Sequence, residues 1–335
     1  MTFLAGSIPA EHAAGHILVL PCPDEPVAVS PMAAAWFSDV AWLREPARTA
    51  GARRMTGARF RGIQQSALVT PGVMRLGEEH IATGPFTLDA KKLAELGMNA
   101  RKGEAYALAR SDGLRDVRGA APSSYEDRDG IARSFPQALP QGEELRVIQW
   151  AVAAARKTGG MVLGDGRQPM VPDPQGSVNL ALYSAHPLAP GDVLPLLRAF
   201  IATAEVRSDQ PTPDGSPRYQ LAGATAYDGT IVVDVERVDR VPRALGALDW
   251  RAYGPFAYRL SWVPADPYEL ELEQPSGLHV IARARMRASL ARLALTLQSR
   301  IAGVVVDDGG FVANATELEG RNDAQTNDGG ARVWV

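Results

Sequence analysis

The residues best suited to acid–base or metal chemistry stand together at Glu78-Glu79-His80. Two carboxylates and an imidazole offer three metal ligands or an acid–base pair. On a strand, neighbouring side chains point to opposite faces, so only Glu78 and His80 would converge. The same residues are also typical of the solvated edge of a strand, and this is the interpretation that we favour.

Carboxylates recur where two short apolar runs end, at Asp165-Gly166 and at Asp307-Asp308-Gly309. Hard cations prefer carboxylate oxygens, so these aspartates are candidate metal ligands. Asp-Gly between two apolar runs is nevertheless the expected hairpin turn, because glycine accepts positive φ at little cost. We therefore predict structural roles for both Asp-Gly pairs. The weak candidates for ligand binding are Glu78, His80, Asp307 and Asp308.

Other signatures of catalysis are missing from the sequence. It contains no nucleophile elbow, no phosphate-binding loop and no zinc-binding helix motif. Gly164-Asp165-Gly166 begins like a dinucleotide fingerprint but leads to Pro169 and not to a helix. The single cysteine, Cys22, forms no intramolecular disulfide, and the prolines on both sides favour a rigid turn over a catalytic thiol. We expect no cofactor and no metal.

The charge of the chain limits its partners. A formal net charge of −3 at pH 7 gives no general attraction to nucleic acid or to an anionic membrane. The densest basic stretch, 44–61, has few aromatic residues, and we interpret it as a solvated loop. No apolar run is long enough to span a membrane, and residues 1–16 lack the pattern of a signal peptide, so we expect a soluble, cytoplasmic protein. Its partner is an unknown small molecule or protein, and a homo-oligomer is compatible with the sequence.

One pattern occurs twice, at 145–171 and at 288–312. At a constant offset of 143 residues, apolar residues spaced by three and four positions recur in both stretches, as on one face of a helix. A short apolar run and an Asp-Gly turn follow each helix, and we expect two extra residues after the first turn. These matches predict an internal duplication. The aligned pairs are Val147 with Leu290, Trp150 with Leu293, Ala151 with Ala294 and Ala154 with Leu297.

Gly160 and Gly303 align at the ends of the two predicted helices. Helices commonly end in a left-handed residue, a conformation that glycine adopts without strain. We therefore expect the replacement of either glycine by valine to cost about 1–2 kcal/mol or more.

A weaker similarity joins Gly84-Pro85-Phe86 to Gly254-Pro255-Phe256, and Tyr106–Arg110 to His279–Arg283. Its larger offset is explained if 112–140, a long polar stretch, is an insertion in the first half. On this alignment, Tyr106–Arg110 and its match are both predicted as strands.

The order of elements indicates an α+β fold. Each half runs β-α-β-β, further strands, α and a β-hairpin, which is typical of an antiparallel or mixed sheet with helices on one face. We predict two similar, ferredoxin-like lobes related by a pseudo-two-fold axis, over 1–173 with the inserted loop 112–140 and over 174–315. Residues 316–335 are predicted as a polar tail. Capping signals predict a helix over 31–43.

These observations favour a non-enzymatic binding or protein-interaction protein. A seam between two duplicated lobes is concave and suits a ligand or partner. The alternative is a hydrolase or a metal-dependent enzyme, with a site assembled from Glu78, His80, Asp307 and Asp308.

Overall fold

The structure is a computed structural model in which the chain forms two compact units. Unit one contains Met1–Tyr125 and Asp129–Pro172, and unit two contains Glu126–Arg128 and Asp173–Val335. The structure describes residues 4, 6–22, 27–48, 69–122 and 127–327. Much of the basic stretch 44–61 therefore lies outside the described residues.

Unit one is built on a seven-stranded sheet in which all neighbouring strands are antiparallel. A separate two-stranded ribbon pairs β3 (Ala47–Arg48) with β4 (Val69–Thr70). The strands of the large sheet are β1 (His16–Pro21), β2 (Ala41–Arg44), β5 (Gly72–Leu76), β6 (His80–Asp89), β7 (Lys102–Arg110), β8 (Met161–Gly164) and β9 (Gln168–Met170). Their order across the sheet is β2-β5-β6-β7-β1-β8-β9.

Unit two also has a seven-stranded antiparallel sheet. Its strands are β10 (Leu180–Ser184), β11 (Glu205–Asp209), β12 (Tyr219–Ala224), β13 (Thr230–Arg237), β14 (Phe256–Val263), β15 (Val304–Asp307) and β16 (Val312–Ala313). Their order is β11-β12-β13-β14-β10-β15-β16. In unit one, β1 lies between β7 and β8, the strands before and after the long helix α4 (Gly142–Thr158). In unit two, β10 lies between β14 and β15, the strands before and after the long helix α6 (Gly277–Ile301). The two strand orders therefore correspond position by position.

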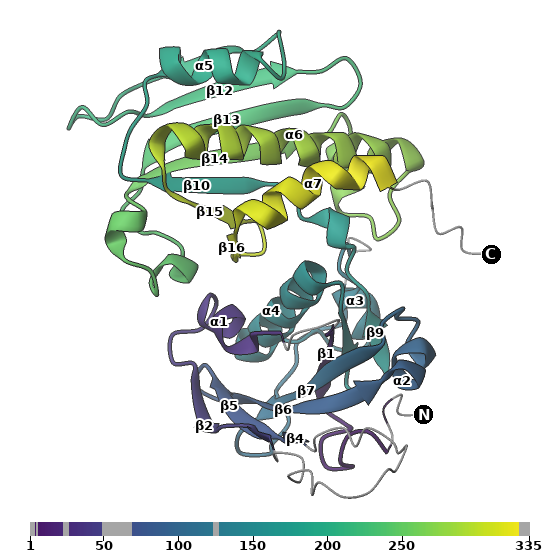
Figure 1. Ribbon diagram of the computed structural model, residues 1–335. Helices are drawn as coiled ribbons and strands as arrows, with labels where there is room; N and C mark the ends of the chain where they lie inside the picture. The colour runs from purple at the N-terminus through teal and green to yellow at the C-terminus, as the bar shows by residue number, and fades with distance from the viewer. Residues whose placement is uncertain (1–3, 5, 23–26, 49–68, 123–126, 328–335) are drawn as a thin grey trace, which may run out of the picture. The chain divides into compact units, whose positions relative to one another are not determined.

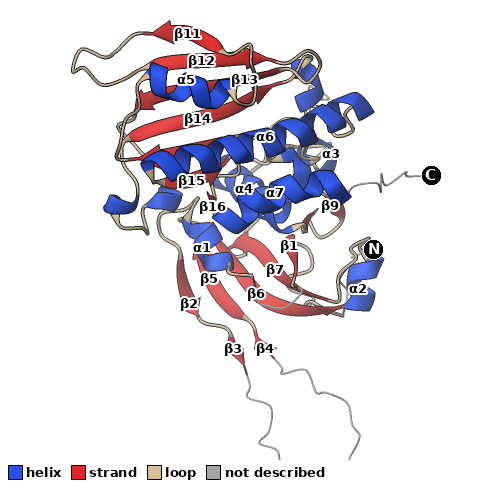
Figure 2. Ribbon diagram, turned by 45° about the horizontal axis from the view of Figure 1, so that its top comes forward, coloured by secondary structure: helices blue, strands red, loops and turns tan. Residues whose placement is uncertain are grey.

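Seven α-helices complete the described part of the chain, and the fold is α+β as predicted. In Figures 1 and 2, α5, α6 and α7 lie on one face of the second sheet. Within the described residues, no helix is long and apolar enough to cross a membrane. The helices are α1 (Val29–Ala34), α2 (Ala90–Glu95), α3 (Ile131–Ser134) and α4 (Gly142–Thr158) in unit one, and α5 (Pro190–Arg198), α6 (Gly277–Ile301) and α7 (Ala315–Asn327) in unit two.

The apolar faces predicted for the two repeated helices are confirmed. All eight aligned positions are at most 1% exposed, four in α4 and four in α6. In unit two these side chains join a core with the inner faces of β10, β12, β13 and β14. Burial of a large apolar side chain contributes roughly 1.5–3 kcal/mol, so these helix faces are a main source of stability for each unit.

Both predicted Asp-Gly hairpins form. The first turn has Asp165 at φ 48° and Gly166 at φ 65°, while in the second the positive φ of 80° falls on Gly310. Aspartate tolerates the left-handed region better than most residues, which explains the first arrangement.

The register of the hairpins keeps the offset of 143 residues throughout. Val162 of β8 pairs with Met170, and Val305 of β15 pairs with Ala313. The prediction of two extra residues after the first turn is therefore wrong, because both hairpin loops have the same length.

The weaker similarity does not join equivalent elements. Tyr106–Arg110 lies in β7, whereas His279–Arg283 lies in α6. The side chain of Ser276 caps this helix by accepting the backbone N–H of His279 at 3.2 Å. Buried residues then recur at helical spacing, which makes the strand prediction wrong for this stretch. They are His279, Ala282, Arg283 and Met286.

Most of the predicted polar tail is α7. Asn314 and Glu317 form a reciprocal cap: Asn314 Oδ1 accepts the N–H of Glu317 at 2.9 Å, and Glu317 Oε2 accepts the N–H of Asn314 at 3.2 Å. Leu318 is fully buried in the core of unit two. The prediction of a tail is therefore wrong for 316–327, and 328–335 lie outside the described residues.

The helix predicted over 31–43 is also wrong in its second half. α1 ends at Ala34, and β2 begins at Ala41. Trp42 pairs with Met74 of β5, so strand pairing decides the conformation of this segment.

Gly160 and Gly303 both pass close to a strand backbone. A Cβ on Gly160 would lie 2.3 Å from the carbonyl oxygen of Val19 in β1, and a Cβ on Gly303 would lie 2.4 Å from that of Tyr183 in β10. Gly303 has φ +114°, as predicted. The left-handed conformation predicted for Gly160 is wrong, because Gly159 takes it with φ +70°.

We expect Gly160→Ala and Gly303→Ala each to lower the free energy of unfolding by about 2 kcal/mol or more, because the new methyl group overlaps a carbonyl oxygen. Gly277→Ala is the matched control, since nothing lies within 4 Å of a Cβ at that position. Chemical denaturation of the three variants checks this prediction. It fails if Gly160→Ala or Gly303→Ala is as stable as the control.

Candidate functional site

His80 is the centre of an ion-pair network in unit one. Its side chain, at the start of β6, is 1% exposed. Its Nδ1 lies 3.0 Å from Oε1 of Glu143, and its Nε2 lies 3.1 Å from Oδ2 of Asp116. Carboxylate oxygens only accept hydrogen bonds, so both ring nitrogens donate when the imidazole is protonated.

The structure places Glu79, and not Glu78, in this network. Both glutamates lie in the turn between β5 and β6, so the alternation of side chains expected for a strand does not apply. The carboxylate of Glu143 accepts the backbone N–H groups of Glu78, Glu79 and His80 at 3.2, 2.9 and 3.0 Å. Burial raises the pKa of Glu143, but these hydrogen bonds outweigh it and bring the pKa below its ordinary value.

Glu79, His80 and Asp116 offer ligand atoms within 4.8 Å of one another. One guanidinium contacts both acids: Arg110 Nη1 lies 2.7 Å from Oε2 of Glu79 and 3.4 Å from Oδ1 of Asp116. Arg110 Nη2 also binds Asp112, at 2.7 Å. Arg110 thus competes with a metal ion for these carboxylates, which favours a structural ion-pair network.

A second histidine network surrounds His16 of β1. The backbone N–H of Asp165 points at Nδ1 of His16, 3.2 Å away, and an N–H group can only donate. Nδ1 is therefore an acceptor, and Nε2 donates to Oε1 of Glu144 at 3.1 Å. This contact joins the first strand of unit one to the first turn of α4.

Arg118 closes the second network. It binds both carboxylate oxygens of Asp165, at 2.7 and 2.8 Å, and Oε1 of Glu144 at 2.7 Å. Burial raises the pKa of Glu144, but hydrogen bonds from His16 and Arg118 outweigh it, so the pKa lies below its ordinary value. Burial also raises the pKa of Asp165, but the hydrogen bond from Arg118 and the nearby positive charges together outweigh it, so this pKa too lies below its ordinary value.

Both networks depend on the stretch 112–140, which joins β7 to α4 and supplies Asp116 and Arg118. Their glutamates are neighbours in the first turn of α4, where acidic side chains suit the positive end of the helix dipole. Each histidine is buried, and both of its ring nitrogens have hydrogen-bond partners. We therefore assign these networks to the stability of unit one.

Cys22 is buried at the end of β1. Burial raises the pKa of its thiol, which is opposite to the change that activates a nucleophilic cysteine. Among the described residues, its thiol donates to the carbonyl oxygen of Leu20 at 3.9 Å, a contact with the strand that precedes it.

The predicted acidic candidates of unit two hold backbone in place. Asp307 Oδ1 accepts the N–H of Phe311 at 2.9 Å within the hairpin. Asp308 accepts the N–H of Val178 at 3.2 Å and the hydroxyl of Ser177. These bonds fix the β15–β16 turn to the segment that enters β10. The four predicted ligands thus fall in different units, two in each.

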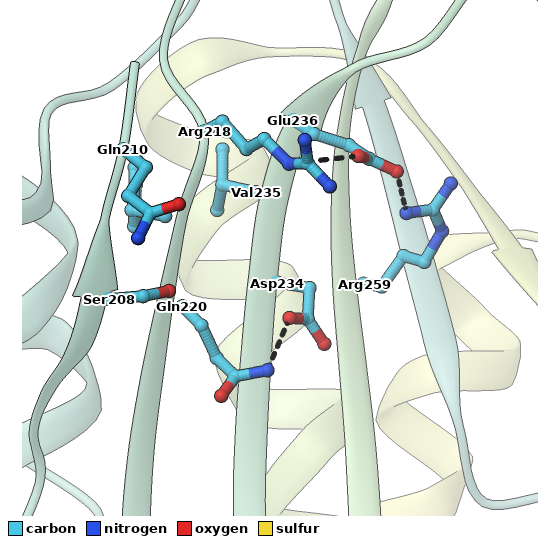
Figure 3. A pocket seen from close by; sticks show the side chains of 9 residues that line it. Ser208, Gln210, Arg218, Gln220, Asp234, Val235, Glu236 and Arg259 are labelled. Carbon is cyan, nitrogen blue, oxygen red and sulfur yellow. Dashed lines mark hydrogen bonds and ion pairs between the residues drawn. The ribbon is translucent and has the colours of Figure 1, made fainter. Parts of the chain in front are cut away.

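A polar groove of about 320 Å³ lies on the outer face of the second sheet. Side chains alternate along a strand, so this face is opposite the core residues Leu221, Val233 and Leu260 that pack toward the helices. The side chains drawn in Figure 3 line the groove. Most of them are polar or charged, and the full set is Ser208, Gln210, Arg218, Tyr219, Gln220, Asp234, Val235, Glu236 and Arg259.

Strand register puts four of these residues in one cross-strand row. Ser208 lies opposite Gln220, Gln220 opposite Asp234, and Asp234 opposite Arg259. Gln220 Nε2 donates to Oδ1 of Asp234 at 2.7 Å, as Figure 3 shows. The row therefore presents an ordered series of donors and acceptors across β11 to β14.

Glu236, two residues further along β13 than Asp234, connects Arg259 of this row to Arg218. It accepts from Arg259, and its Oε2 lies 3.9 Å from Nε of Arg218. Both arginine side chains remain accessible to solvent, at 42% exposure for Arg259 and 66% for Arg218. The groove thus combines two cations with two carboxylates.

Sequence reasoning missed this surface, although a signal was present. In β13, Asp234 and Glu236 alternate with Val233 and Val235, a pattern that places the acids on one face of the strand. The pattern does not reveal that Arg218 and Arg259 occupy neighbouring positions, because that depends on the order of strands. Comparison of the chain with protein-family models, with curated proteins and with solved structures found no match.

Proposed function

We propose that this protein is a non-enzymatic binding or protein-interaction protein, and that the polar groove on the outer face of its second sheet contacts the partner. The observation that carries the proposal is the cross-strand row from Ser208 to Arg259. Hydrogen-bonding side chains that are partly exposed and fixed by one another suit recognition of a polar partner.

The internal bonds of the groove favour binding because they reduce its entropic cost. Asp234 holds Gln220, and Glu236 holds Arg259, so these side chains lose less freedom when a partner arrives. Mixed charges favour a partner with both donors and acceptors, such as a polypeptide segment or a small polar molecule. They give no support to a nucleic acid partner, which requires a net basic surface.

The edge of the sheet is unsuited to strand addition. All five residues of β11 are exposed, and three of them are charged, which protects an edge strand from pairing with another chain. The register of β11 with β12 also shifts between Val206 and Ser208. We infer that a partner engages the side chains of the face and not the backbone of the edge.

The wider proposal includes the duplication. Equivalent strand orders and the conserved offset in both hairpins support two ferredoxin-like lobes, each enlarged by extra strands. A binding seam between the lobes and a hydrolase or metal-dependent site that combines Glu78, His80, Asp307 and Asp308 stay predictions. The single cysteine suits a reducing compartment, and we propose the cytoplasm.

Site-specific photo-crosslinking tests the proposed surface. A photoreactive residue in place of Ser208 should give a discrete crosslinked species in a lysate of the source organism. The same residue at Ser299, exposed on α6, is the control and should not give that species. Asp234→Arg should abolish the crosslink at position 208 by reversing a charge in the row. A species that forms equally at both positions, or that persists in Asp234→Arg, contradicts the proposal.

A further inference from the structure

A second groove lies on the helical face of unit two, away from the proposed surface. Its volume is about 680 Å³, within the range of small-molecule sites. Its walls come from three parts of the chain: the end of α5, the β12–β13 turn and one side of α6. On α6 it extends from Ile281 to Arg292, which corresponds to roughly 16 Å of helix.

The groove has an apolar floor and an apolar wall. Ile201 and Met286 are buried within it, at 6% and 4% exposure. Ile281 is 51% exposed, and Phe200 is partly buried against the core. An apolar chain placed here would cover surface that is now in contact with water, which is favourable in proportion to the area removed.

The two arginines that line the groove differ in their partners. Arg285 lies 3.3 Å from Oδ1 of Asp228, so its charge is neutralised within the groove. Arg292 has its guanidinium 5.6 Å from the ring centroid of Phe200 and a hydrogen bond to Ser289 Oγ at 3.4 Å. Within the described part of the chain, no carboxylate lies at ion-pair distance from Arg292.

We propose that this groove binds a small amphipathic carboxylate, with its alkyl chain along Ile281 and Phe200 and its carboxylate on Arg292. The planar guanidinium offers paired donors that match the two oxygens of a carboxylate. The guanidinium of Arg292 lies against the ring of Phe200, so a charged contact for the carboxylate is next to an apolar contact for the alkyl chain. The neutral Arg285–Asp228 pair adds no second anion site, so the ligand has one acidic end.

Decanoate, used below its micellar concentration, is the probe. Calorimetric titration should show saturable binding, and the methyl NMR signals of Ile281 and Met286 should shift in the same concentration range. Arg292→Gln should weaken binding at least about tenfold, because a charge-assisted hydrogen bond is lost. Arg300→Gln changes an exposed arginine of α6 outside the groove and should bind like wild type.

The charge of the probe separates this site from general apolar adsorption. Decyltrimethylammonium has a comparable alkyl chain and the opposite charge, and it should bind much more weakly than decanoate. Equal binding of the two probes overturns the proposal, as does wild-type affinity in Arg292→Gln or an absence of shifts at Ile281 and Met286. Circular dichroism of Arg292→Gln establishes that a loss of binding is not a loss of folding. The variants and probes differ from those of the sheet groove, so either proposal can fail without the other.

Discussion

Glu144→Ala is expected to destabilise unit one by about 3–5 kcal/mol, because it leaves buried polar partners without their carboxylate. The side chain of Glu144 is 2% exposed. Its oxygens accept from Nε2 of His16 and from the guanidinium of Arg118, which is 25% exposed. Removing the acid leaves the Arg118 charge with Asp165 as its remaining ion-pair partner among the described residues.

A matched exposed pair is the control for this experiment. Glu95 lies 2.9 Å from Lys92 on the surface of α2, and Glu95→Ala should cost about 0–1 kcal/mol. Native-state hydrogen exchange reports the loss where it occurs: protection of amides in β1 and α4 should fall in Glu144→Ala. Equal protection in the two variants would show that the His16 network does not stabilise the unit.

The effect of Glu144→Ala should also depend on pH. The pKa of Glu144 is lower in the folded protein than its ordinary value. A carboxyl with a depressed folded pKa contributes stability above the unfolded pKa, and this contribution is lost as the pH falls through the folded pKa. The stability difference between wild type and Glu144→Ala should therefore narrow under acid conditions. A difference that is constant from neutral to acid pH contradicts this account.

Local patterns predicted the parts of the fold that local forces decide. The spacing of Trp150 and Leu293 with their apolar neighbours identified two buried helix faces, because helical periodicity is a property of a single segment. The turns at Asp165 and Asp308 were predictable for the same reason, since the conformational freedom of Asp-Gly acts within a few residues.

The errors arose where a cap or a distant strand decides the structure. Asn314 and Glu317 carry a capping box, a signal that was present but outweighed by the polar composition of the tail. In 31–43, the helical propensity of an alanine-rich segment is overridden because Trp42 pairs with β5.

The candidate sites depended still more on distant residues. His80 was predicted as a candidate, but its partners Asp116 and Glu143 lie far along the chain. The position of Asp116 follows from the path of 112–122 after β7, which no local pattern specifies. The same holds for Arg218 and Arg259, which the strand order brings to the same face.

Trp150→Ala and Leu293→Ala test whether the two long helices have equivalent roles. Trp150 is fully buried, lies against Phe37 with ring centroids 5.8 Å apart, and donates from Nε1 to the carbonyl of Met32 at 3.1 Å. Leu293 is fully buried at the aligned position of α6. We expect costs of about 3–5 kcal/mol for Trp150→Ala and about 2–5 kcal/mol for Leu293→Ala, because each leaves a cavity in a packed core.

The strands that lose hydrogen-exchange protection in each variant show whether the two long helices have equivalent roles. Trp150→Ala should reduce hydrogen-exchange protection in β1 and β8, and Leu293→Ala should do so in β10 and β15, since these strands lie in the same unit as the altered helix. Gln149→Ala, at the exposed neighbouring position of α4, should change stability by no more than about 0.5 kcal/mol. If either core variant is as mild as Gln149→Ala, that helix does not have the central place that the repeated pattern assigns to it. If both core variants are strongly destabilised and each loses protection in its own sheet, α4 and α6 have equivalent roles although the aligned residues are 143 positions apart.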